Sequence, residues 1–163
     1  MATPIQLLIG FMNWLHLIAT VAWFGGLTVN VLILMPSMQA TLDPPTAGKL
    51  LNTYMGRFRR LVYVSILVLV LTGAAIAWIM NPAYLELSSE WSIIMAIKHV
   101  IVAIAIIATL YSFEILAPKV ARLAAQGPSP ELAKLQQIQM TAARVAFIVA
   151  LLILLLTGIQ TAL

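Results

Sequence analysis

Residues 5–35 read IQLLIGFMNWLHLIATVAWFGGLTVNVLILM, and no charged side chain interrupts them. A helix needs about 20 mostly apolar residues to cross a bilayer, so this stretch is long enough to span it with a tilt. No basic segment precedes the stretch as one would in a cleaved signal peptide. We therefore expect a retained transmembrane helix at the start of the chain.

The remaining apolar stretches predict three more spans. With the first, the expected set is about 5–35, 59–80, 91–117 and 142–162. Of the 163 residues, 63% are hydrophobic and 9% are charged, against roughly a quarter charged in soluble domains. This composition excludes a soluble globular protein. It predicts one all-α membrane domain over 1–163, an up-down-up-down four-helix bundle in contact with the lipid bilayer.

The charged residues predict the orientation. Basic residues lie between the first two and the last two spans or at the adjoining span ends: Lys49, Arg57, Arg59, Arg60, Lys119, Arg122, Lys134 and Arg144. The middle connection carries Glu86 and Glu90 instead. By the positive-inside rule, both basic connections are cytoplasmic and both termini extracytoplasmic, in what we expect to be a bacterial inner membrane. The net charge of +4 is thus a topology signal and does not indicate nucleic-acid binding.

The two halves of the chain resemble each other at offsets of 82 to 85 residues. The matches pair Met12 with Met95, His16 with His99, Pro36 with Pro118, and Arg59, Thr72 and Gly73 with Arg144, Thr157 and Gly158. Chance similarity of Leu-rich spans does not account for matches at such residues. The pattern predicts two tandem helical hairpins related by a pseudo-twofold axis along the membrane normal.

Both histidines of the chain, His16 and His99, fall inside predicted spans at similar depths. Two imidazoles facing each other in a helical bundle suit the two axial positions of haem b. Because the chain has no Cys, thiolate metal sites and c-type haem are excluded. The leading hypothesis is a bis-His b-type cytochrome that transfers electrons to or from a quinone or an extracytoplasmic redox partner.

Met12 and Met95 each lie four residues before a histidine, and thus one helical turn away on the same face. Two thioethers and two imidazoles form a soft ligand set for Cu(I), so a copper-handling protein is the alternative. Methionine also fills gaps in helix packing, so both residues have a structural interpretation. A cofactor-free subunit of a homo-oligomer or a larger complex remains a further alternative.

Three neighbours complete the candidate cofactor site. Asn13 and Trp23 share a helical face with His16, where the amide can hydrogen-bond to the ring and the indole can form a wall. Lys98 precedes His99 and is costly within a span. It can contact a haem propionate or extend to the lipid headgroups.

These residues carry a family resemblance. WLHLIATVAWFGG at 14–26, the basic run that leads to Thr72-Gly73, and WSIIMAIKH at 91–99 resemble the copper-resistance D (CopD) family. The layout is also similar to the four-helix membrane protoporphyrinogen oxidases that bind haem b. The resemblance implies a four-span core and either copper handling across the inner membrane or haem-linked redox work, including porphyrinogen oxidation. It points to His16, Lys98 and His99 as functional positions.

Overall fold

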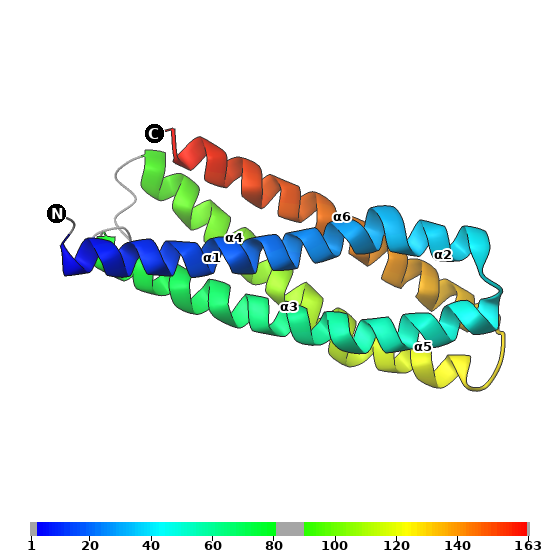
Figure 1. Cartoon of the computed structure of the whole chain (residues 1–163). Coiled ribbons are helices and arrows are strands. Elements are labelled where there is room, and N and C mark those ends of the chain that lie inside the picture. The colour runs from blue at the N-terminus through cyan, green and yellow to red at the C-terminus, as the bar shows by residue number, and fades with distance from the viewer. Residues whose placement is uncertain (1–2, 81–89, 163) are drawn as a thin grey trace. The chain divides into compact units, whose positions relative to one another are not determined.

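The structure, a computed structural model, describes residues 3–80 and 90–162, with the side chains of 44, 45 and 80 left aside. Four helical segments in this part of the chain are long and apolar enough to cross a membrane, and no strand occurs in it (Figure 1). The predicted fold class is confirmed: an all-α, integral membrane protein of four long helices.

The helical segments consist of α-helices and two short π-helical turns. In chain order they are α1 (Pro4–Val29), η1 (Asn30–Leu34), α2 (Met35–Thr41), α3 (Pro44–Met80), α4 (Glu90–Tyr111), η2 (Ser112–Leu116), α5 (Ala117–Ala124) and α6 (Pro130–Gln160). The basic residues expected in the first connection lie within α3, because helix formation continues up to the pair of prolines that begins it. Only Leu42 and Asp43 join α2 to α3.

The chain divides into two compact units, Met1–Glu86 and Leu87–Leu163, and each contains one helical hairpin. In the first unit α1 packs against α3, and in the second α4 packs against α6. The N-terminal half of α1 lies against the C-terminal half of α3, as the contact of His16 with Thr72 requires. Each unit is therefore an antiparallel pair of long helices, as the internal repeat predicts.

The two π-helical turns occupy corresponding places in the two hairpins. The Met35 amide donates to the carbonyl of Asn30, and the Ala117 amide donates to that of Ser112, each a bond across five residues. The turns are offset by 82 residues, within the range of the sequence repeat. The backbone therefore repeats at the same offset as the sequence.

A proline explains each π-helical turn. Pro36 and Pro118 lie in the first turn of α2 and α5, directly after the widened segments. A proline inside a helix has no N–H to donate, and its ring collides with the carbonyl four residues earlier. Here those carbonyls belong to Leu32 and Glu114. A one-residue expansion before the proline keeps the helix continuous.

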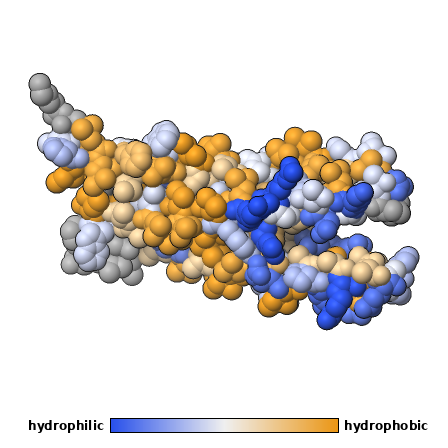
Figure 2. Space-filling model, turned by 60° about the horizontal axis from the view of Figure 1, so that its bottom comes forward, coloured by the Kyte–Doolittle hydropathy of each residue, from blue (hydrophilic) through white to orange (hydrophobic). Residues whose placement is uncertain are grey.

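Large apolar side chains remain exposed along every long helix. Trp78 on α3 is 80% exposed, and Val21 on α1 and Ile107 on α4 are exposed to a similar degree. Figure 2 shows apolar side chains over much of the visible face. An apolar surface of this extent requires a nonaqueous surrounding, and in helices of this length that surrounding is the lipid bilayer.

Candidate functional site

His16 is held by the neighbouring helix. Its Nδ1 lies 2.8 Å from Oγ1 of Thr72, and the Thr72 side chain is buried on α3. The Thr72 hydroxyl donates its one hydrogen to the carbonyl of Val68 at 2.6 Å. The hydroxyl must then accept from His16, which assigns the imidazole proton to Nδ1. In the neutral ring, the lone pair is therefore on Nε2, the atom with which histidine commonly binds haem iron.

Gly73 lies beside this ring. A Cβ atom built on Gly73 would lie 3.4 Å from Cε1 of His16, so the imidazole lies against the glycine backbone. Thr72 and Gly73 therefore both adjoin His16: Thr72 accepts its hydrogen bond, and Gly73 borders the ring. From the sequence, Thr72 and Gly73 stand out only as members of the internal repeat, because a single sequence does not indicate which spans pack against each other.

Four further residues of α1 lie within about two helical turns of His16. Thr20, one turn further along α1, donates to the backbone carbonyl of His16 at 2.8 Å. Asn13 is exposed, while Met12 and Trp23 are half-buried. The acceptor for His16 Nδ1 thus comes from α3 and not from the neighbours on α1.

His99 also carries a proton on Nδ1, but its acceptor is a backbone carbonyl of its own helix. It is exposed on α4, and its Nδ1 lies 2.7 Å from the backbone carbonyl of Met95. A carbonyl can only accept, so Nδ1 carries a proton, and in the neutral ring the lone pair is then on Nε2. Both neutral imidazoles therefore have the tautomer in which Nε2 can ligate a metal.

The second hairpin does not repeat the contacts that Thr72 and Gly73 make with His16. Thr157, the counterpart of Thr72, donates to the Ile153 carbonyl at 2.8 Å. A Cβ atom on Gly158, the counterpart of Gly73, would meet no atom within 4 Å. The sequence repeat therefore extends to the helices and the π-helical turns, whereas the two histidines have different surroundings.

A polar contact links the two helices of the second hairpin. The half-buried Lys98 donates from Nζ to Oε1 of Gln160 at 2.6 Å, and Gln160 is only 6% exposed at the end of α6. Gln160 does not stand out from the sequence as a candidate functional residue. The available signal was a single amide at the end of an otherwise apolar span.

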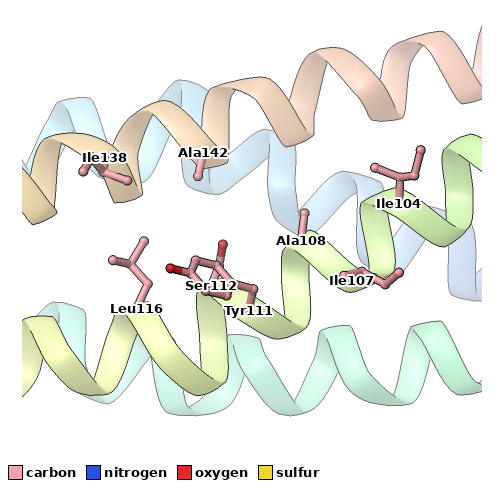
Figure 3. A pocket seen from close by; sticks show the side chains of 8 residues that line it. All are labelled: Ile104, Ile107, Ala108, Tyr111, Ser112, Leu116, Ile138 and Ala142. Atoms are coloured by element: carbon pink, nitrogen blue, oxygen red, sulfur yellow. The ribbon is translucent and has the colours of Figure 1, made fainter.

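A shallow apolar groove lies between α6 and the segment formed by α4 and η2 (Figure 3). It has a volume of about 470 Å³. Its lining residues are Ile104, Ile107, Ala108, Tyr111, Ser112, Leu116, Ile138 and Ala142. The hydroxyls of Tyr111 and Ser112 lie among these aliphatic side chains in the space between the two helices.

Metal ligation by acidic or imidazole clusters is absent from the described residues. Within 3–80 and 90–162, no group of three or more His, Cys, Asp or Glu side chains could hold a metal ion. His16 belongs to the first unit and His99 to the second. A cofactor site that combines them therefore stays a prediction.

Comparison with known proteins gives one family. Residues 18–129 match the model described as "Domain of unknown function (DUF4149)". The chain belongs to the DUF4149 family. The DUF4149 region includes Thr72, Lys98 and His99, begins two residues after His16 and ends before Gln160. No curated protein and no solved structure matches the chain.

Proposed function

We propose that this DUF4149 protein is a membrane-embedded haem b protein that transfers electrons, with His16 and His99 as axial ligands. The observation that supports this function is the shared state of the two imidazoles. Each uses Nδ1–H for a hydrogen bond, to Thr72 or to the Met95 carbonyl. In its neutral form, each therefore carries its lone pair on Nε2.

The surroundings of both rings suit axial ligation. A ligating histidine usually donates its second ring N–H to an oxygen, which fixes the ring and raises the basicity of the ligating nitrogen. Thr72 and the Met95 carbonyl are such oxygens. Haem b bound there would supply a one-electron iron couple, and two protein ligands would leave no iron position for a substrate. This arrangement favours electron transfer, with a membrane quinone or an extracytoplasmic protein as the partner.

Met12 and Met95 support a second candidate, a copper site. Each lies one helical turn before its histidine, and both are half-buried. A set of two imidazoles and two thioethers would favour Cu(I). Copper transport or resistance is then the alternative function, and porphyrinogen oxidation is the enzymatic variant of the haem hypothesis.

Optical spectra of the detergent-purified protein test both candidates. After expression with sufficient haem, we expect a Soret band, sharp α and β bands on reduction, and about one iron per chain. His16→Ala and His99→Ala should each abolish the low-spin spectrum, and free imidazole should partly restore it. The double variant Met12→Leu/Met95→Leu is the matched control, because it should leave the haem spectrum unchanged.

Metal analysis of the same samples separates the outcomes. A colourless protein that contains copper, and loses it in the Met12→Leu/Met95→Leu variant, would favour the copper candidate. A folded protein with neither iron nor copper would refute both.

A further inference from the structure

Lys98 and Gln160 form a polar pair within the second hairpin. Lys98 belongs to a membrane-spanning segment, where a basic side chain is unfavourable unless it is paired or reaches water. In the described part of the chain, the partner of its ammonium is the Gln160 amide oxygen at 2.6 Å. An amide orients the ammonium but does not neutralise its charge.

Gln160 is also incompletely satisfied. Its Nε2 is buried and has no hydrogen-bond partner among the described residues. An amide nitrogen has two N–H donors, and an ammonium has three, of which Gln160 Oε1 takes one. The pair therefore presents N–H donors and one positive charge, and the buried Gln160 Nε2 lacks an acceptor among the described residues. A buried donor without an acceptor is costly, so a ligand that accepts from Gln160 Nε2 and from the Lys98 ammonium would be stabilising.

We infer that Lys98 and Gln160 form a binding site for an anionic oxygen ligand, a carboxylate or a phosphate, within the second hairpin. The Gln160 amide fixes the Lys98 ammonium, and the remaining N–H groups of both side chains bind the anion. Hydrogen bonds to ionised groups are shorter and stronger than neutral ones, which compensates for desolvation of the ligand.

Two sources can supply this anion. One is a haem propionate, and this source rests on the proposed function. Lys98 and His99 are successive residues, so their Cα atoms are about 3.8 Å apart and their side chains diverge by about 100° around α4. A carboxylate on a group bound at His99 is then within reach of the Lys98 ammonium. The other source is the phosphate of an anionic lipid.

Haem b and its dimethyl ester distinguish the propionate source. We would titrate both into the full-length apoprotein and compare their dissociation constants. The wild type should bind haem b about 10- to 100-fold more tightly than the ester, because the ester lacks the negative charge. In Lys98→Met and in Gln160→Leu, haem b and its ester should bind with similar dissociation constants, because the charge-assisted hydrogen bonds to the propionate are lost.

Two further variants control for charge and folding. Lys119→Met removes a positive charge elsewhere, from an exposed ion pair with Glu131 at 3.1 Å, and should keep the preference for haem b. Gln160→Glu supplies Lys98 with a carboxylate of its own. It should remove the preference while the protein stays folded, which separates loss of binding from loss of structure.

Nanodiscs test the lipid source without haem. In native mass spectrometry, the wild type should retain more phosphatidylglycerol than phosphatidylcholine. Lys98→Met should lose this preference for phosphatidylglycerol. Binding of haem b and of its ester with equal affinity, together with no Lys98-dependent lipid retention, would overturn the anion site and leave the haem proposal intact. Absence of haem binding would refute the proposed function, and the lipid comparison alone would then decide the anion site.

Discussion

His16 and Thr72 are 56 residues apart in the chain, yet the imidazole Nδ1 and the hydroxyl oxygen lie 2.8 Å apart. Because the hydroxyl hydrogen is committed to the Val68 carbonyl, the direction of this bond is determined. Its geometry connects the packing of the first hairpin to the chemistry of its histidine. It also makes Thr72 a positioning residue that acts through His16.

Thr72→Val tests this role, since valine keeps the shape of threonine and removes the acceptor. The His16 N–H would lose its partner in a half-buried place, at a cost of about 1–3 kcal/mol in unfolding free energy. Removal of such a hydrogen bond typically lowers metal affinity about 10- to 100-fold. Haem titration and detergent-based unfolding measure the two effects.

Thr157→Val is the matched control for Thr72→Val. Thr157 is the repeat counterpart, and its hydroxyl donates to the carbonyl of its own helix. We expect a change in haem affinity of less than about two-fold, because no imidazole depends on this hydroxyl. Equal effects of the two substitutions would contradict the assigned role of Thr72.

Gly26→Ala is expected to destabilise the first hairpin. The added Cβ would lie 3.0 Å from Cε2 of Phe58, and the Phe58 ring is only 7% exposed. Overpacking of this kind costs about 1–3 kcal/mol. Thermal unfolding in detergent measures the loss.

Gly25→Ala gives the comparison for that experiment. A Cβ on Gly25 would meet nothing within 4 Å, and alanine is favoured over glycine in helices by up to about 1 kcal/mol. Gly25→Ala should therefore be neutral or stabilising. If both alanines had the same effect, the close approach of Gly26 to Phe58 would not limit helix packing.

Asp43 gives the first hairpin a pH-dependent helix start. The Thr46 backbone N–H donates to Asp43 Oδ2 at 3.1 Å, and this bond holds the pKa of the Asp43 carboxyl below its usual value. A carboxyl whose pKa is lower in the folded state stabilises that state above its unfolded pKa, which is about 4. The contribution is lost as the pH falls from there through the lowered pKa.

Amide exchange at Thr46 checks this prediction. Exchange at this position should accelerate relative to mid-helix amides of α3 as the pH falls below about 4, after correction for intrinsic rates. Asp43→Asn retains a capping oxygen without the charge, so its protection should not change over the same interval. If the protection of the Thr46 amide fell with pH in Asp43→Asn as it does in the wild type, the pH dependence would belong to another titrating group.

The sequence predicts the fold class well because apolar length and charge placement are local properties. Residues 5–35 identify the first helix without any partner, and the repeat identifies the hairpins. The ends of the helices are harder to predict. Arg57 to Arg60 mark a membrane boundary, but charge does not end a helix, and α3 begins at Pro44.

The surroundings of the candidate site depend on contacts between helices. Asn13 was expected near the His16 ring because it shares a face of α1, whereas the Nδ1 acceptor, Thr72, comes from α3. Gln160 was overlooked for the same reason, since its contact with Lys98 forms only when α6 packs against α4. Helical periodicity predicts neighbours on one helix and not those on the next.

The absence of cysteine from the natural chain allows a direct test of the proposed orientation. Single cysteines can be introduced at Gln126, between α5 and α6, and at Thr161, which follows α6. By the positive-inside rule the basic end faces the cytoplasm, so in intact cells an impermeant maleimide should label Thr161→Cys and not Gln126→Cys. Permeabilised cells should show labelling at both positions, which controls for accessibility. The reverse labelling pattern in intact cells would show that the orientation is inverted. The redox partner of a haem bound at His16 and His99 would then be expected on the cytoplasmic side.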